Sequence, residues 1–137
     1  MANSTTLFRL PDGRMAVDVT ENKTLALKDC GVVQNVIADA LTLTLPSTVV
    51  GYNFTARNGG DNASGTPTRS GADGTVAVTV SPAAVDLIAG MEVTAADNKD
   101  FVNTKATSKV GDEITLVGDG VNGWMAVNIV GTWAKEA

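Results

Sequence analysis

The residues of this chain that could do chemistry are its carboxylates. The 137 residues include 15 Asp and Glu and 10 Lys and Arg, but no histidine. A chain without histidine cannot form a Ser-His-Asp triad or a Cys-His pair, and it lacks the usual ligand of zinc and non-haem iron sites. The chemistry that remains is catalysis by two facing carboxylates or the binding of a hard cation.

Most of the carboxylates stand in turn-like sequence. Asp12 lies in "PDG", Asp61 in "GDN", Asp73 in "ADG" and Asp119 in "GDG". In such turns the Asp side chain commonly closes the turn by bonding its own backbone. The stretches "DNASG" and "DNKD" gather oxygens, but neither matches a twelve-residue calcium loop. We therefore predict no catalytic residue, no cofactor and no enzyme activity, while a cation in the loop around Asp61 stays open.

Two single residues have structural interpretations. Cys30 is the one cysteine, so it cannot form a disulfide within the chain, and we expect it to pack as a small apolar side chain. Asp86 lies in the apolar stretch "SPAAVDLIAG". A carboxylate there needs a hydrogen-bond partner or an exposed strand face, which favours a structural or interface role.

The glycine-rich stretch "GDGVNG" at 118–123 resembles a phosphate-binding loop in composition only. A phosphate cradle opens a helix, whereas the following residues "WMAVNIV" alternate as a strand does. The pattern predicts a hairpin of strands 113–117 and 124–130. Trp124 and Trp133 are then expected to pack the end of the fold, with a sugar-stacking role for Trp124 as the alternative.

Period-two alternation of apolar residues recurs along the chain. It is clearest in "ALTLTLP" and "GTVAVTV", and weaker strand patterns occur at 15–19, 24–27, 32–37, 52–57, 85–88 and 100–104. Only 4% of the residues are aromatic, so the core must be aliphatic. Short strands at such spacing predict an all-β fold, a jelly-roll-like β-sandwich of about 8–10 short antiparallel strands.

The domain organisation follows from composition. Residues 1–20 are polar with scattered apolar positions and are expected to form an extended N-terminal arm or an edge hairpin, which could be removed without unfolding the rest. Residues 21–137 are expected to form one sandwich domain. Within it, residues 58–74 contain five glycines and no apolar side chain larger than alanine, which predicts a long exposed loop.

The charge of the chain bears on its partners. The formal net charge is −5, with no run of basic residues, so binding to nucleic acid or to a membrane surface is not expected. The first residues lack the apolar segment of a signal peptide, and no apolar run is long enough to cross a bilayer. We therefore expect synthesis in a cytoplasm.

Three phrases together carry a family resemblance: "LTLTLPSTVVGYNFTARNGG", "VTVSPAAVDLIAG" and "VGDEITLVGDGVNGWMAVNIVGTWAKE". Over residues 40–134 their order resembles small β-sandwich or jelly-roll proteins that decorate and cement the heads of tailed bacteriophages. It is also similar to modules of phage tail fibres. The resemblance implies a structural virion protein on the capsid exterior, made in the host bacterium, a homo-oligomer (dimer or trimer), and the major capsid protein as partner.

The alternative is a receptor-binding module of a tail fibre that recognises carbohydrate through Trp124 or Tyr52. For a capsid-binding protein, the N-terminal stretch 1–20 and the long loop 58–74 are the expected contact elements. The candidate contact residues are Leu7, Phe8, Arg9, Leu10, Arg57, Asp61, Asn62, Arg69 and Asp73.

Overall fold

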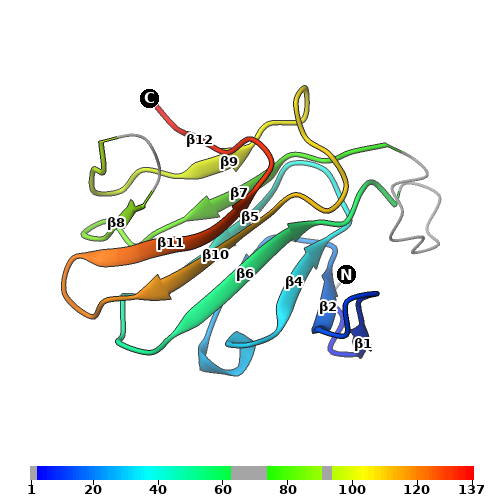
Figure 1. Cartoon of the computed structure of the whole chain (residues 1–137), viewed down its shortest axis with the longest axis horizontal. Coiled ribbons are helices and arrows are strands. Elements are labelled where there is room, and N and C mark those ends of the chain that lie inside the picture. The colour runs from blue at the N-terminus through cyan, green and yellow to red at the C-terminus, as the bar shows by residue number, and fades with distance from the viewer. Residues whose placement is uncertain (1–2, 63–73, 91–93) are drawn as a thin grey trace.

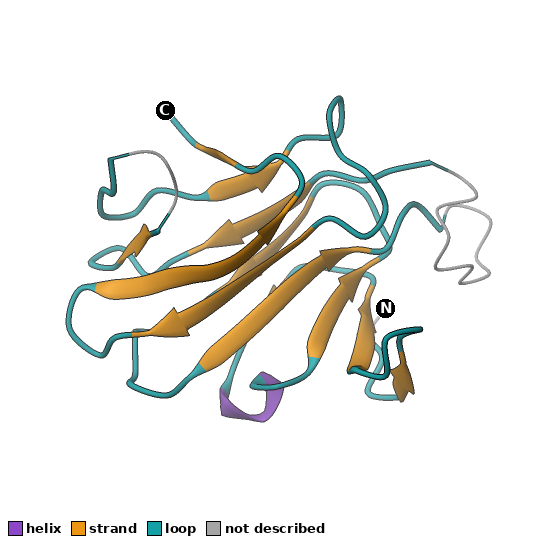
Figure 2. Cartoon of the chain, viewed as in Figure 1, coloured by secondary structure: helices purple, strands orange, loops and turns teal. Residues whose placement is uncertain are grey.

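A computed structural model of the chain describes residues 3–62, 74–90 and 94–137. Its regular structure is almost all β, arranged as two sheets packed against each other (Figures 1 and 2). Sheet A has seven strands in the order β1-β2-β4-β6-β10-β11-β8, and sheet B has five in the order β12-β9-β7-β5-β3. The strands are β1 (Leu7–Arg9), β2 (Met15–Val19), β3 (Lys23–Thr24), β4 (Val33–Val36), β5 (Leu41–Thr44), β6 (Asn53–Asn58), β7 (Val78–Ser81), β8 (Leu87–Ala89), β9 (Phe101–Asn103), β10 (Glu113–Gly118), β11 (Gly123–Val130) and β12 (Ala134–Lys135), with one short 3₁₀ helix, η1 (Leu27–Asp29).

The first half of the chain winds between the two sheets. From β2 to β7 each strand lies in the sheet opposite to the one before it. The chain therefore returns to each sheet in the same direction, and its neighbours there are parallel: β2 with β4, β4 with β6, β3 with β5, and β5 with β7. The result is a flattened coil of parallel strands, seen in Figure 1 from blue to green.

The second half is mainly antiparallel. β10 and β11 form the predicted hairpin, and β10 also pairs with β6. In sheet B, β9 pairs with β7 and β12 pairs with β9, both antiparallel. Only β8 runs parallel to its neighbour β11 in this half.

The expectation of an antiparallel jelly roll is not confirmed. Neighbouring strands of a jelly roll are antiparallel, whereas half of the strand pairings in the described residues are parallel, four of them in the coil and one between β8 and β11. The described part also has twelve strands rather than eight to ten. The additional strands are short pieces such as β1 and β12, whose two or three residues show no alternation. The all-β, two-sheet architecture itself is confirmed.

The core between the sheets is built from the alternating residues, as predicted. Leu43 and Val78 of sheet B and Ile114 of sheet A have no exposed surface. Each such side chain contributes roughly 1.5–3 kcal/mol by leaving water. Phe54, Phe101, Trp124 and Trp133 are the buried aromatic residues of this cluster, so the aliphatic residues dominate it.

The N-terminal residues form a hairpin at the edge of sheet A and not an extended arm. β1 pairs with β2, and β2 pairs in turn with β4. Ala16 and Val19 on β2 are fully buried. The edge hairpin is the one of the two expected forms that the structure shows. Because deletion of residues 1–20 would remove β2 and its buried side chains, we now expect that deletion to destabilise the sheet.

A buried polar network joins the two halves. The Asn58 amide, at the end of β6, donates to the Asn103 side-chain oxygen on β9 (2.8 Å) and to the Val76 carbonyl (2.8 Å). The Asn103 amide donates to the Asp112 carboxylate (3.1 Å) and to the Thr132 carbonyl (3.0 Å). Because buried polar groups are costly without partners, this network fixes β6, β9 and the start of β10 relative to one another.

Candidate interaction surfaces

The expected contact residues of the N-terminal hairpin point in two directions. Leu7 is 51% exposed, and Arg9 is exposed with its guanidinium donating to the Gly13 carbonyl (2.9 Å). Leu10 is buried and packs with Ala16 and Val33, and the half-buried Phe8 packs against the same cluster. Only Leu7 and Arg9 of these four are thus presented to a partner.

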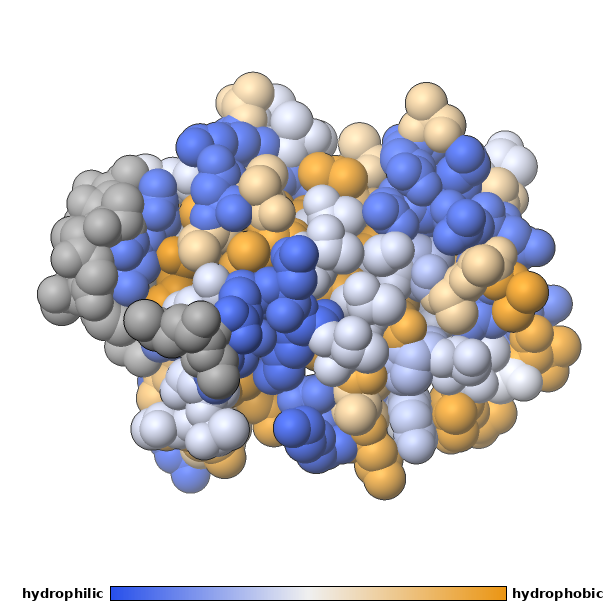
Figure 3. All heavy atoms as spheres, turned by 180° about the vertical axis from the view of Figure 1, so that it is seen from behind, coloured by the Kyte–Doolittle hydropathy of each residue, from blue (hydrophilic) through white to orange (hydrophobic). Residues whose placement is uncertain are grey.

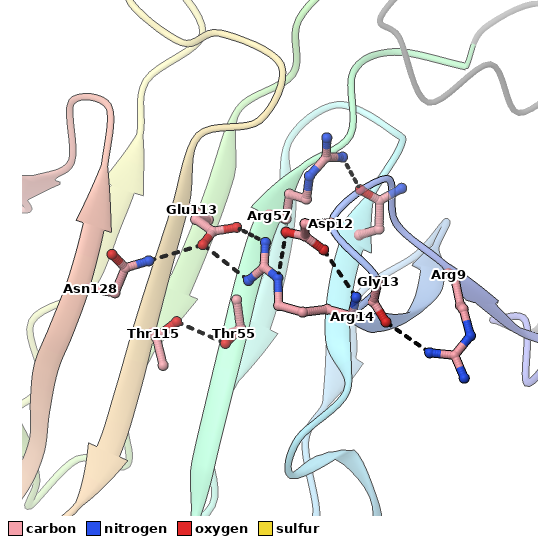
Figure 4. Close-up of polar contacts among 10 residues, drawn as sticks. Arg9, Asp12, Gly13, Arg14, Thr55, Arg57, Glu113, Thr115 and Asn128 are labelled. Carbon is pink, nitrogen blue, oxygen red and sulfur yellow. Dashed lines mark hydrogen bonds and ion pairs between the residues drawn. The ribbon is translucent and has the colours of Figure 1, made fainter.

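The tip of this hairpin lies over the face of sheet A that is turned away from sheet B. From it Arg14 reaches across the sheet to Glu113 on β10, as Figure 4 shows, with Nη1···Oε1 at 3.1 Å and Nη2···Oε2 at 2.8 Å. The bond to Glu113 is the main cause that raises the pKa of Arg14. Asn128 on β11 donates to the same carboxylate (2.9 Å). Glu113 therefore connects two strands, β10 and β11, with the hairpin.

Arg57, another expected contact residue, is used within the sheet. Asp18, Asn35, Arg57 and Glu113 are consecutive cross-strand neighbours on β2, β4, β6 and β10. Arg57 donates to the Asn35 oxygen (2.7 Å), and the Asn35 amide donates to Asp18 (3.0 Å). Burial lowers the pKa of the Arg57 guanidinium. The Arg57 side chain is hydrogen-bonded to its neighbour on the polar face of sheet A, so it is only partly available to a partner.

The remaining expected residues belong to the long loop. Asp61 and Asn62 are half-buried, and their backbone N–H groups donate to Gly74 (2.7 Å) and Ile37 (2.9 Å). Arg69 and Asp73 lie outside the described residues. The structure therefore brings Arg57 together with the hairpin, but it does not unite the described members of the set into one exposed surface.

The Gly-rich turn behaves as predicted. One Asp119 carboxylate oxygen accepts from the backbone N–H groups of Val121 (2.7 Å), Asn122 (2.8 Å) and Gly123 (3.0 Å). These bonds, led by the one from Gly123, lower the pKa of Asp119. A carboxylate that already receives three donors closes the turn and is poorly suited to act as a general base.

Both tryptophans are packed inside. Trp124 is 1% exposed and its ring lies 5.4 Å from that of Phe54, while Trp133 is 8% exposed. This confirms the packing role and removes Trp124 as a sugar-stacking platform. Tyr52, which stands edge-on to Phe54, is half-buried.

Asp86 has the structural role that the sequence favoured, and it ties three loops together. It is 3% exposed and accepts from the Thr48 backbone N–H (2.9 Å). The Thr48 hydroxyl accepts from the Gly120 N–H (3.0 Å), and Leu87 N–H donates to the Asn122 carbonyl (3.1 Å). The loops that precede β6, β8 and β11 are thus bonded into one end of the molecule.

This end carries exposed valines that sequence reasoning missed. Their exposed fractions are large, and they come from all three loops: Val49 (42%), Val50 (73%), Val85 (76%) and Val121 (80%). We call these four residues the valine tip. These loops lie at the left end of the molecule in Figure 1, and Figure 3, which is turned by 180°, shows hydrophobic atoms at the lower right, the same end. The available signal was valine inside turn sequences such as "STVVGYN" and "DGVNG", where polar residues are usual.

A pocket of about 190 Å³ lies beside the N-terminal hairpin, lined by Ser4, Thr5, Leu7, Val17, Lys23, Lys28, Asp29 and Val32. Its Lys23 ammonium is already held by Gln34 (2.7 Å) and by Asp29 (3.2 Å). The charge of Lys23 is therefore largely neutralised within the chain, and Lys28 is the other basic residue that lines the pocket.

Three further findings complete the description. Cys30 is a free, half-buried thiol packed against the core. Within residues 3–62, 74–90 and 94–137 no group of three Cys, Asp or Glu side chains is placed to hold a metal ion. No helix in that described part has the length and apolarity to span a membrane.

Comparisons with family models, with curated proteins and with solved structures found no match for this chain.

Proposed function

We propose that this chain is a structural virion protein that binds the outer surface of a tailed-bacteriophage head and cements the shell of major capsid protein. Its localisation would be the capsid exterior, after synthesis in the host bacterial cytoplasm. The sequence pattern over residues 40–134 supports the family, and the geometry supports the mode of action, which is contact between surfaces rather than chemistry.

The observation that carries the proposal is the valine tip. Three loops hold four exposed valines, and hydrogen bonds through Asp86 and Thr48 fix those loops to one another. A fixed apolar surface binds without paying the ordering cost of a mobile loop. Contiguous exposed apolar residues commonly mark protein–protein contacts. We assign the valine tip to the capsid contact, with Leu7 and Arg9 of the hairpin as further contacts.

Binding of the purified protein to purified heads that lack it tests this assignment. The double variant Val50→Asp/Val121→Asp places two carboxylates on the valine tip without touching the core. We expect its affinity for heads to fall at least about tenfold, the effect of losing a central contact. Leu27→Asp is the matched control, because Leu27 is 63% exposed and lies on η1, outside the three loops.

The control is expected to bind heads as the wild type does. Absence of the protein from purified virions would overturn the proposal, and equal binding by the tip variant and the control would overturn the role of the valine tip. Binding to a glycan array in place of heads would favour the alternative, a receptor-binding module of a tail fibre.

A further inference from the structure

The outer edge of β11 is the feature that the proposed function leaves unused. β8 pairs with β11 only at residues Gly123 to Met125. Beyond this point, among the residues the structure describes, no strand pairs with residues 126–130 on the side away from β10. We call residues 126–130 the β11 edge. This outer side is not free along its whole length, because the Val130 carbonyl accepts from the Trp133 indole N–H (3.1 Å) and Gly90 lies against the Ala126 backbone. The backbone N–H and C=O groups between these two points are the ones that another strand can pair with.

The side chains along this strand are apolar and exposed. Val127 is 58% exposed, Val130 45% and Ile129 39%, and the adjoining Met125 is 45% exposed. Residues 120–134 contain no charged residue at all, although the chain as a whole carries a net charge of −5. Two copies of an acidic chain repel each other, so an uncharged segment is the surface on which they can meet at least electrostatic cost.

The other outer strands are protected in the ways that natural proteins use. β1, β3 and β12 are two or three residues long and carry Arg9, Lys23 and Lys135 respectively, while β8, the other end strand of sheet A, has three residues and no charge. Short length and a basic side chain both discourage pairing with another chain. The β11 edge is longer and has no charge. Its one irregularity is a bulge at Val127, which has no partner on β10 because Leu116 pairs with Ala126 and Thr115 with Asn128; residues 128–130 stay in regular register with β10.

We infer that the β11 edge pairs antiparallel with the β11 edge of a second copy of this chain, so that two copies of sheet A join into one continuous sheet. An antiparallel pair of identical strands has two-fold symmetry, which is the symmetry of a closed dimer. β8 limits the pairing at one end, and at the other end the chain leaves the strand at Gly131. This inference is independent of the capsid, because it concerns the purified protein alone.

Sedimentation of the full chain over a range of concentrations tests it. We expect the wild type to form a dimer, and Val127→Lys to raise the dimer dissociation constant at least about tenfold by placing a like charge on each strand of the pair. Leu27→Lys is the control with a similarly exposed position outside β11. A wild type that stays monomeric, a trimer, or an unchanged dimer in Val127→Lys would each overturn the inference.

Disulfide trapping gives a second readout that does not depend on a loss of binding. In a Cys30→Ser background, single cysteines are placed at Val127, Asn128 and Ile129. The residue nearest the two-fold axis faces its own copy at about 4.5–5.5 Å between Cβ atoms, close enough for a disulfide after small adjustments. We expect at least one of the three to give a covalent dimer on oxidation and Leu27→Cys to give none. Failure of all three, with the fold intact by circular dichroism, would overturn the inference.

Discussion

The two halves of this molecule make sheets in different ways. Between β2 and β7 the chain changes sheet at every step, so that Ala16 pairs with Val33 and Leu41 with Val78, far along the chain. Between β10 and β11 it stays in one sheet and turns back within a few residues, so that Gly118 pairs with Trp124. The first half depends on contacts between distant residues, whereas this hairpin depends on a local turn.

This difference in connectivity indicates which interactions stabilise each half. The hairpin is set by residues that act on their neighbours, such as Asp119 closing the turn at residues 119–123. In the coil, the direction of neighbouring strands follows from the repeated change of sheet, and the strands are held by the shared core and by polar bonds to the second half. We therefore expect the coil to depend on the second half, and the following changes test that dependence.

The largest effect is expected for Asn103→Ala, which cuts the buried network between the halves. The change removes the partner of the Asn58 amide and one donor to Asp112, both inside the protein. We expect the free energy of unfolding to fall by about 2–4 kcal/mol, measured by urea denaturation. The exposed Asn122→Ala serves as control. If the halves are coupled, unfolding stays a single transition, and a separate early transition of one half would contradict this view.

A second change compares one glycine from each half. Gly131, after β11, and Gly51, before β6, have nearly the same positive φ, +87° and +89°. A Cβ at Gly131 would collide with the Asp112 carboxylate, while a Cβ at Gly51 would meet no atom within 4 Å. Both variants place an alanine at a positive φ. The difference between their free energies of unfolding therefore isolates the contact of the new Cβ with the Asp112 carboxylate. We expect Gly131→Ala to be less stable by roughly 1–3 kcal/mol in thermal or urea unfolding. Equal losses would show that Asp112 moves aside freely.

The smallest effect concerns acid and the hairpin turn. The folded chain lowers the pKa of Asp119, and the unfolded chain restores its ordinary value near 3.9, so the carboxylate adds stability at neutral pH. That contribution is fully present above the ordinary pKa and is lost as the pH falls through the lower, folded pKa. We expect the wild type to be more stable than Asp119→Asn near neutral pH, with the difference in free energy of unfolding becoming smaller as the pH falls below the ordinary pKa of Asp. A gap that does not change with pH would contradict this account.

The sequence predicted the positions of the strands better than it predicted which strands pair and in which direction they run. Strands at 41–45, 76–80, 113–117 and 124–130 were read from alternation, and the structure places strands there with small shifts at the ends. The hairpin was predictable because its turn chemistry is local. The parallel coil was not, because alternation shows which side of a strand is buried and is silent on the direction of its neighbour.

The interaction surfaces were harder to predict for a related reason. Leu10 and Arg57 are of residue types that bind partners, yet Leu10 is buried and Arg57 bonds to Asn35. Val50 and Val121 are of types that fill cores, yet both are mostly exposed. Only tertiary contacts separate these cases, since the residue type is the same whether a side chain faces the core or a partner.

The placement of the tryptophans and of Cys30 has a practical consequence for spectroscopy. Both indoles sit in the second half, with Trp124 sealed against Phe54, and the lone thiol sits in the first half at the end of η1. An acceptor dye on Cys30 would receive energy from the indoles across the sandwich. The unaltered chain thus carries its own donor and attachment point, and a loss of energy transfer would report the moment at which its two halves part.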